Sequence, residues 1–325
     1  MTTTTGTPST ATAATSTTPS ALPAAAASTW RLGDRTVNRL GFGAMRVAGT
    51  FGSPTPRPRE DAIAVLRRAV ELGVNHVDTA AFYFLPTRSA NELIGAALQP
   101  YADDLVITTK IGAAQSRDGR FEPYARPDQL RGHVEENIRQ LGLDHLDVVN
   151  LRWGAGLERE AGSIAEHVGA LADLRDAGLV RHVGVSNVLP EQLDEALTIT
   201  PVVCVQNRYG LTERDDDGLL ARCGELGIAF VPFFSMGAAV PGAVPGGTAD
   251  ETGLAQVAAV AAKHGATPAQ VRLAWTLHRG PHVLAIPGTG DLAHLEQNVA
   301  AAALRLTDDD LATLDGIAQP ADRAN

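Results

Sequence analysis

The stretch LVITTKIGAAQSRDGRFEPYARPDQLRGHVEENIRQLGLDHLDVVNL, residues 105–151, contains two apolar, strand-like runs on either side of a helical pattern. The runs at 105–110 and 146–151 are short and rich in β-branched and apolar residues, as expected of buried strands. Between them, residues 127–141 place apolar residues three or four apart and start with Pro127, which favours a helix. Strand, helix and strand in this order predict a parallel βαβ unit.

The same alternation continues over most of the chain. Further strands are predicted at residues 39–43, 75–78, 182–185, 202–206, 228–232 and 283–286, and further helices at 59–72, 164–177 and 268–277. Eight strands in alternation with helices favour an α/β fold of the (β/α)8 TIM-barrel type. A doubly wound open sheet is the alternative that this periodicity leaves open. The N-terminal part of the sequence has no GxGxxG before a helix, which counts against the dinucleotide-binding version of that alternative.

Composition restricts the kind of protein. Hydrophobic residues make up 44% and charged residues 20% of the 325 residues, which is enough for a globular core. A net charge of -10 argues against nucleic acid or a membrane surface as a partner, because both are anionic. No apolar run reaches the roughly 20 residues that a membrane-spanning helix needs. Cys204 and Cys223 lack the spacing of a metal site or a disulfide framework, so we expect a reducing, cytoplasmic location.

Residues 1–28 differ in composition from the rest of the chain. They are almost wholly Thr, Ala, Ser and Pro and carry no charged side chain, so we expect a disordered tail. Residues 29–325 are expected to form a single TIM-barrel domain. The sequence does not indicate the oligomeric state, and the expectation is a monomer or a small homo-oligomer.

In a TIM barrel, residues at the C-terminal ends of the strands surround the active site. Asp78 ends the second predicted strand, Tyr83 follows shortly after it, and Lys110 ends the third strand. An ammonium near a phenol lowers the pKa of that phenol, and a carboxylate stabilises the ammonium. The three side chains together predict a general acid that protonates a carbonyl oxygen while a cofactor delivers hydride. The alternative is a structural Asp–Lys ion pair beside a core tyrosine.

Residues 73–83, GVNHVDTAAFY, resemble the G-x-x-x-x-D-T-A-x-x-Y signature of aldo-keto reductases. The resemblance covers nearly everything after residue 30, through ITTK (107–110), GVSN (184–187), VQ (205–206), GATPAQV (265–271) and IPGT (286–289). It implies a TIM barrel that binds a nicotinamide dinucleotide without a Rossmann fold and interconverts aldehydes or ketones and alcohols. It also implies that Tyr83 is the proton donor, Lys110 the group that activates it, and Asp78 the partner of that lysine.

A cofactor site follows from the same resemblance. Ser186, Asn187 and Gln206 match the residues that bind the nicotinamide carboxamide, and Phe233 matches the aromatic residue that stacks on the nicotinamide ring. Further matches lie around the pyrophosphate and the adenosine 2′-phosphate: Phe234, Met236, Gly288, Thr289, His294, Gln297 and Asn298. Many family members have lysine and arginine where this chain has Gly288 and His294. The site expected for the adenosine 2′-phosphate is therefore uncharged. NADPH is the expected cofactor, and NADH is the alternative.

Arg152, at the end of the fourth predicted strand, departs from the family pattern, which has a catalytic histidine there. Arginine does not release a proton at working pH, so the proton must come from Tyr83, and Arg152 can hold the carbonyl oxygen. A second cation beside Lys110 needs a compensating negative charge, so we expect a substrate that carries an anionic group. The alternative is an arginine held by a loop carboxylate.

The residues after the fourth and seventh predicted strands are similar to the bacterial branch of the family that includes pyridoxal reductase. This similarity favours pyridoxal, or a similar anion-bearing aldehyde, as the small-molecule carbonyl substrate. A sugar or an antibiotic intermediate is an alternative substrate. A weakly catalytic or silent barrel that senses the cofactor is an alternative function. No metal site is predicted.

Overall fold

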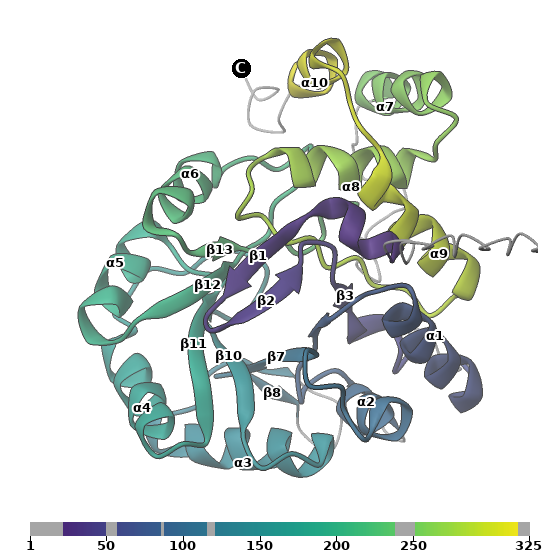
Figure 1. Ribbon diagram of the computed structural model, residues 1–325. Coiled ribbons are helices and arrows are strands. Elements are labelled where there is room, and N and C mark those ends of the chain that lie inside the picture. Colours follow the sequence, from purple (N-terminus) through teal and green to yellow (C-terminus); the bar gives the residue numbers. More distant parts are fainter. Residues whose placement is uncertain (1–21, 50–56, 86–87, 116–120, 238–250, 318–325) are drawn as a thin grey trace, which may run out of the picture.

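The computed structural model describes residues 22–49, 57–85, 88–115, 121–237 and 251–317, and these form a closed α/β barrel (Figure 1). Seven strands make one sheet, in which all pairs are parallel: β3 (Phe42–Gly43), β4 (His76–Asp78), β7 (Val106–Ile111), β10 (Leu146–Arg152), β11 (Val180–Ser186), β12 (Val202–Gln206) and β13 (Ala229–Phe230). The predicted strand at 283–286 closes the sheet, because Val283 pairs with Phe230 and Ala285 pairs with Leu40. The barrel prediction is therefore confirmed, and the open doubly wound sheet is excluded.

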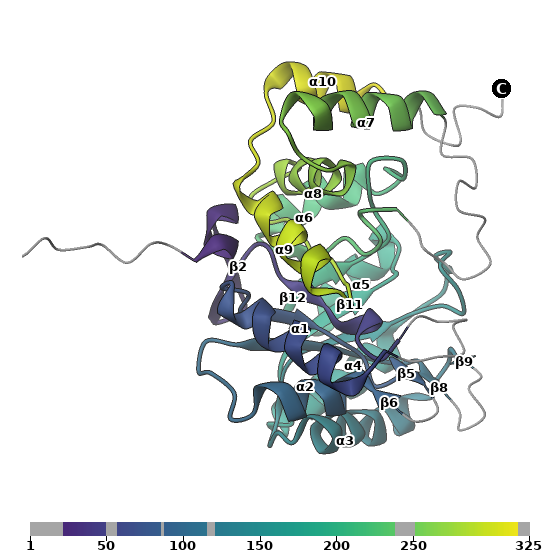
Figure 2. The same cartoon turned by 90° about the vertical axis from the view of Figure 1, so that its right-hand side faces the viewer.

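Helices surround the barrel on its outer side (Figure 1). This ring consists of α1 (Arg59–Glu71), α2 (Ala90–Leu98), α3 (Leu130–Leu141), α4 (Ala165–Asp176), α5 (Pro190–Ile199), α6 (Asp217–Leu226), α8 (Pro268–His278) and α9 (Leu292–Ala300). Two more helices lie further out: α7 (Glu251–Lys263) packs on α8, and α10 (Asp308–Asp315) packs on α7 (Figure 2). The predicted helices at 59–72, 164–177 and 268–277 agree with α1, α4 and α8 to within one residue at each end.

Local sequence determines where these helices begin and end. The Thr267 hydroxyl accepts the N–H of Gln270, and the Gln270 side chain accepts the N–H of Thr267, which is a capping box at the start of α8. Pro268 occupies the first helical position, where its missing N–H costs no hydrogen bond. Helix α3 ends at Gly142, whose φ of 65° lies in the left-handed region that glycine adopts without a steric penalty.

A hairpin that the sequence analysis did not predict covers the N-terminal end of the barrel. Strands β1 (Thr29–Leu32) and β2 (Arg35–Asn38) pair antiparallel and lie across the opening (Figure 1). Leu32 and Val37 are buried in one cluster with side chains of the barrel wall, namely Val106, Val148, Cys204, Ala229, Val231 and Leu284. The hairpin therefore closes this end with apolar side chains.

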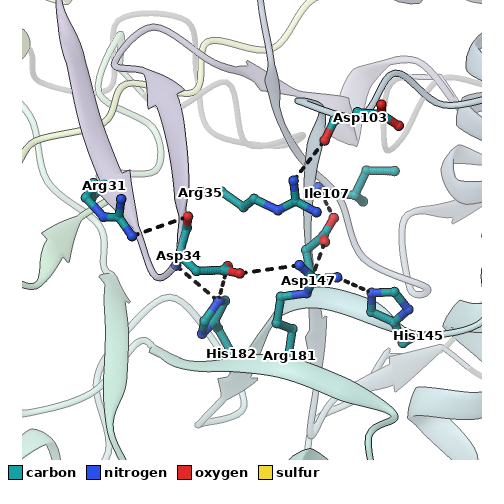
Figure 3. A network of polar contacts seen from close by, with 9 residues as sticks. All are labelled: Arg31, Asp34, Arg35, Asp103, Ile107, His145, Asp147, Arg181 and His182. Carbon is teal, nitrogen blue, oxygen red and sulfur yellow. Dashed lines mark hydrogen bonds and ion pairs between the residues drawn. The ribbon is translucent and has the colours of Figure 1, made fainter.

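Polar contacts attach the hairpin turn to neighbouring parts of the barrel (Figure 3). Asp34 Oδ1 lies 2.6 Å from His182 Nε2, and Asp34 Oδ2 lies 3.4 Å from Arg181 Nη1. Arg35 Nη1 donates to the carbonyl of Asp103 at 3.0 Å. Because these groups are partly or fully exposed, the contacts orient the turn and contribute little to stability.

The beginning of the described chain differs from the expected tail. Residues 1–21 lie outside the described part, but residues 23–27 form a short 3-10 helix, η1 (Pro23–Ala27), ahead of the hairpin. Ala24 and Ala27 are buried, and the Ala24 N–H donates to the carbonyl of Leu72 at 3.0 Å. The prediction that the tail continues to Ser28 is therefore wrong at its C-terminal end. Composition did not reveal this, because small alanine side chains gain their burial from the particular surface on which they pack.

The remaining short elements are the hairpins β5 (Phe84–Leu85) with β6 (Arg88–Ser89) and β8 (Ala114–Gln115) with β9 (Phe121–Glu122), and the 3-10 helices η2 (Ala44–Arg46), η3 (Pro127–Gln129) and η4 (Ala301–Ala303). Both hairpins follow the C-terminal ends of barrel strands. In the part of the chain that is described, no helix has the length and hydrophobicity needed to cross a bilayer.

Candidate active site

The parallel register of the sheet brings the predicted catalytic residues to one rim of the barrel. Lys110 pairs with Asn150 across β7 and β10, and two residues further on Arg152 pairs with Ser186 across β10 and β11. A cavity of about 430 Å³ opens at this rim. It is lined by Gly43, Met45, Arg46, Asp78, Phe82, Tyr83, Lys110, Phe121, Arg152, Ala155, Gly156, Leu157, Ser186, Phe233, Phe234, Ser235, Met236, Gly237, Ile286, Pro287 and Gly288. All four predicted catalytic residues therefore face one cavity.

Asp78, Lys110 and Tyr83 form one cluster. Lys110 Nζ donates to Asp78 Oδ1 at 2.6 Å and to the carbonyl of Thr79 at 3.0 Å. Both side chains of the ion pair are almost completely buried, with 3% of Asp78 and 5% of Lys110 exposed. Lys110 Nζ also lies 4.9 Å from the centre of the Tyr83 ring. The predicted juxtaposition of phenol, ammonium and carboxylate is therefore present.

A tight turn after β4 directs Tyr83 back over the barrel. The Tyr83 N–H donates to the carbonyl of Ala80 at 3.0 Å, which closes the turn. The Tyr83 carbonyl in turn accepts the N–H of Ala90, the first residue of α2, at 2.9 Å. The backbone of Tyr83 is thus fixed on both sides, so its hydroxyl is held near Lys110 by local structure.

The acidity of Tyr83 differs from the expectation. Burial raises the pKa of the Tyr83 phenol above its ordinary value, and the Lys110 and Arg152 cations offset only part of that rise. The prediction of an unusually acidic phenol is therefore wrong as a net effect, although Lys110 acts in the predicted direction. For Lys110, burial alone lowers the pKa, but Asp78 and Tyr83 more than compensate, so the net pKa is raised. At neutral pH the phenol is thus protonated and the amine charged.

Gln206 has a second contact that the sequence did not predict. Its Nε2 donates to Asp78 Oδ2 at 2.7 Å, so the Asp78 carboxylate is held by Lys110 on one oxygen and by Gln206 on the other. A carboxylate only accepts hydrogen bonds, which fixes the orientation of the Gln206 amide and leaves its Oε1 free to accept. Gln206 therefore positions Asp78 and still offers an acceptor at the rim.

The three residues predicted to bind a carboxamide share an unusual feature. Ser186 Oγ, Asn187 Oδ1 and Gln206 Oε1 are buried without a hydrogen-bond partner in the described part of the protein. Asn187 has a φ of 61° and is held through its Nδ2, which donates to the carbonyls of Trp153 at 3.0 Å and Glu158 at 2.9 Å. Buried polar atoms without partners are costly, so their presence indicates a ligand group with matching donors and acceptors. A carboxamide, with two N–H donors and one acceptor oxygen, fits this set.

The other predicted cofactor residues divide into two groups. Phe233, Phe234, Met236 and Gly288 line the cavity, and the rings of Phe233 and Phe234 meet edge to face at 5.3 Å. The second group lies along the loop and helix after the eighth strand: Thr289 and Asn298 are buried, Gln297 is exposed, and the His294 side chain is 68% exposed. Members of the second group do not line the cavity at the catalytic rim.

Arg57 lies beside this second group and was missed by the sequence analysis. Its Nη1 is 4.0 Å from Asp291 Oδ2, and its side chain packs so closely on Gly290 that a Cβ there would lie 2.9 Å from Arg57 Cδ. Asp291 is also the N-cap of α9, through a hydrogen bond from the N–H of His294 at 3.0 Å. The region that was expected to be uncharged therefore contains an arginine from a distant loop.

Arg152 lines the cavity and is held by backbone carbonyls. Its guanidinium donates to the carbonyls of Trp153 and Gly156, and none of the described carboxylates lies within ion-pair distance of it. Burial lowers the pKa of Arg152 to about 10, an effect that the nearby Tyr83 and Glu160 partly offset. Among the described residues, therefore, no loop carboxylate pairs with Arg152. At neutral pH Arg152 remains a cation that faces the cavity.

Buried asparagines behind the catalytic strands were also missed. Asn137 Oδ1 accepts from the Thr109 hydroxyl at 2.6 Å and from Asn91 Nδ2 at 2.9 Å. Asn91 Oδ1 accepts from the Thr79 hydroxyl at 2.8 Å. These contacts tie the residues next to Asp78 and Lys110 to helices α2 and α3. In sequence, Asn91 and Asn137 are isolated polar residues within amphipathic helices and gave no signal.

Comparisons with known proteins agree with this geometry. The profile of the Aldo/keto reductase family matches residues 39–319. Pyridoxine 4-dehydrogenase of Escherichia coli (strain K12) is 47% identical over 293 residues, which cover 90% of this chain and 98% of that protein. An uncharacterised oxidoreductase of Schizosaccharomyces pombe is 37% identical over 297 residues, covering 91% and 92%.

Solved structures show the same relationship. A thermostable aldo-keto reductase in complex with the inhibitor epalrestat is 29% identical and superimposes with a TM-score of 0.72, covering 89% of this chain and 99% of that one. An aldo/keto reductase of Klebsiella pneumoniae in complex with NADP and acetate is 26% identical, with a TM-score of 0.69 and coverage of 88% and 94%. The chain belongs to the aldo/keto reductase family and is an oxidoreductase. NADPH-dependent carbonyl reduction fits these findings.

Proposed function

We propose that the protein reduces an aldehyde to an alcohol with NADPH and that Tyr83 donates the proton. The observation that carries this proposal is the buried Asp78–Lys110 ion pair next to the Tyr83 ring at the rim of the cavity. The structural alternative, an ion pair beside a core tyrosine, does not account for a cavity that opens onto all three side chains.

The residues of the chain have distinct parts in this reaction. A bound nicotinamide dinucleotide would supply the hydride for the carbonyl carbon. The Tyr83 hydroxyl donates its proton to the carbonyl oxygen, and Lys110 stabilises the resulting phenolate. Asp78 and Gln206 keep the Lys110 ammonium in place. In the direction of alcohol oxidation, the Tyr83 phenolate accepts the proton.

Several side chains would hold the cofactor. The unpaired oxygens of Ser186, Asn187 and Gln206 match a nicotinamide carboxamide, and Phe233 offers an aromatic face at the same cavity. Arg57 supplies positive charge beside the N-terminus of α9, where the sequence suggested an uncharged site. This arginine supports NADPH over NADH, because a phosphate gains most from a cationic partner.

We further propose pyridoxal, or a similar aromatic aldehyde with an ionisable ring hydroxyl, as the substrate. The relative from Escherichia coli is a pyridoxine 4-dehydrogenase. Phe82, Phe121 and Leu157 give the cavity apolar walls, and Arg152 provides a cation without a carboxylate partner in the described structure. An aromatic aldehyde with an anionic oxygen fits both features better than an aldose does.

A substrate panel tests this proposal. We expect NADPH oxidation with pyridoxal, with pyridoxine as the product, and a higher kcat/KM for pyridoxal than for benzaldehyde or D-xylose. Preference for the aldose would contradict the aromatic substrate and support a sugar oxidoreductase. Tight NADPH binding without turnover of any aldehyde would contradict the enzyme and support the cofactor sensor.

The cysteines support our proposal of a cytoplasmic location. Cys204 and Cys223 are both buried free thiols, and Cys204 Sγ donates to Asn150 Oδ1 at 3.1 Å. Free thiols are usual where the surroundings are reducing. Fractionation of the producing cells would test this location, and recovery of the protein outside the cytoplasm would contradict it.

A further inference from the structure

A second cavity lies at the N-terminal end of the barrel, opposite the catalytic rim. It has a volume of about 350 Å³ and is formed by η1, the end of α8, the loop after α8, and η4. Its lining residues are Ala26, Ala27, Ser28, Arg39, Ala274, Leu277, His278, Gly280, Pro281, Ala301, Ala302, Leu304 and Arg305. None of them lines the cavity at the catalytic rim. The two cavities are therefore separate sites.

Two arginines and a histidine give this second cavity its polar character. Arg39 and Arg305 are cations, whereas burial and the two arginines lower the pKa of His278. No acidic residue occurs among the described residues that line the cavity. The protein as a whole carries a net charge of -10. The positive charge of this cavity is therefore opposite in sign to the net charge of the protein.

Arg39 is buried and has no counter-ion among the described residues. Its side chain donates to the carbonyls of Val283 and Ala27 at 3.1 and 3.3 Å, and its remaining donors meet the Ser28 hydroxyl and two further carbonyls. These acceptors are neutral, and none of the described carboxylates forms an ion pair with Arg39. Burial and the nearby Arg305 both lower the pKa of Arg39. An uncompensated buried cation is costly, and a bound anion would lower that cost.

Arg305 is held in a position from which it can bind such an anion. Its Nη1 donates to the carbonyls of Ala302 at 2.7 Å and Leu304 at 3.3 Å, and its Nη2 donates to the carbonyl of Ala26 at 2.7 Å. These bonds fix the guanidinium. Within the described part of the protein, Nε–H and one Nη2–H of Arg305 have no acceptor, so both can donate from one edge of the planar group. His278 lies in the same cavity and can add a further donor.

We propose that this cavity binds a small phosphate monoester, with the phosphate held by Arg305 and His278 in the field of Arg39. A phosphate dianion suits two adjacent arginines better than a monovalent ion does, and the donor edge of an arginine matches its oxygens. The cavity is larger than inorganic phosphate requires, and its remaining walls are mainly small or apolar, including Ala274, Leu277 and Pro281. A phosphate with a small apolar body therefore fits best.

Calorimetric titration of the full-length protein with phenyl phosphate tests this site, with inorganic phosphate as the second ligand and the cofactor site saturated with NADP. We expect phenyl phosphate to bind more tightly than inorganic phosphate. Arg305→Gln should weaken binding about tenfold, the usual effect of losing one charge-assisted hydrogen bond. Arg131→Gln, on the exposed surface of α3, should bind as the unmodified protein does.

A second variant is needed because Arg305 also contacts η1, so that Arg305→Gln could weaken binding by disturbing the fold. His278→Ala removes an exposed side chain together with its donor and should weaken phenyl phosphate binding several-fold without lowering the melting temperature. Equal affinity in the Arg305→Gln and Arg131→Gln variants would overturn the proposal, and so would binding of inorganic phosphate alone or no binding at millimolar ligand. The site does not depend on the proposed reductase activity, so turnover of pyridoxal should be unchanged in Arg305→Gln.

Discussion

At Tyr83, burial and the Lys110 ammonium act on the phenol in opposite directions, and burial has the larger effect. The pKa is therefore raised above the ordinary value of about 10, and the phenol stays protonated throughout the neutral range. Reduction requires the protonated phenol. We predict that kcat/KM for reduction is constant through neutral pH and falls only as the pH rises through this raised pKa, while alcohol oxidation increases over the same range.

The control for this pH profile is Lys110→Met, which removes the cation that offsets the effect of burial. We expect lower activity in this variant and a shift of the basic limb to still higher pH. A limb that falls near pH 7 in the unmodified protein would contradict a raised pKa. A limb that does not move in Lys110→Met would contradict the coupling between the two side chains.

Arg152 permits a second prediction at the scale of single residues. If its cation meets an anionic oxygen of the substrate, Arg152→Ala should raise KM about tenfold or more for salicylaldehyde at a pH where its ring hydroxyl is ionised. It should raise KM much less for 2-methoxybenzaldehyde, which has a similar shape but no ionisable group. Equal losses for both aldehydes, measured by steady-state kinetics, would show that Arg152 does not select for charge.

At the scale of elements, the loop before α1 and the N-terminus of α9 meet at Arg57 and Asp291. We predict that Arg57→Ala weakens NADPH binding about three- to tenfold, because a partly exposed charge contact is lost, and leaves NADH binding nearly unchanged. Quenching of protein fluorescence by each cofactor measures both affinities without turnover. The matched control is Arg131→Ala. An equal change for NADPH and NADH would exclude contact between Arg57 and the 2′-phosphate.

The β1–β2 hairpin contributes stability at the end of the barrel that is away from the reaction. Leu32 is 1% exposed and packs among barrel residues, so Leu32→Ala should lower the free energy of unfolding by about 2–5 kcal/mol. Leu292→Ala, at a position that is 45% exposed, serves as the control and should cost far less. Urea denaturation measures both. If both variants lose a similar free energy of unfolding, the hairpin is not part of the core.

The elements with strong periodicity could be predicted from the sequence, and those without it could not. Helix α1 was expected at residues 59–72, because its apolar residues recur at helical spacing and a glycine follows its end. The β1–β2 hairpin was missed because its strands have four residues each, too few to show a clear alternation. The contact of Arg57 with α9 joins residues far apart in sequence, and local pattern does not contain that information.

At the scale of the whole molecule, barrel closure explains why the catalytic residues could be identified. Strand ends of a parallel barrel meet at one rim, so Asp78, Lys110 and Arg152 had to approach one another once the strands were assigned. The net effect of burial on Tyr83 could not be predicted, because it depends on every group that packs around the phenol. The N-terminal boundary was also misplaced, because η1 packs on the barrel and the folded domain therefore includes residues from Pro23 onward.

The most direct test of the central claim is the rate of NADPH oxidation in a single turnover with pyridoxal, compared between the unmodified protein and Tyr83→Phe. Phenylalanine keeps the ring and removes the proton, so the rate should fall by about 100- to 10,000-fold. The dissociation constant of NADPH, measured on the same samples, should change less than about twofold. A Tyr83→Phe variant that binds NADPH normally and reduces pyridoxal within tenfold of the unmodified rate would show that another group donates the proton.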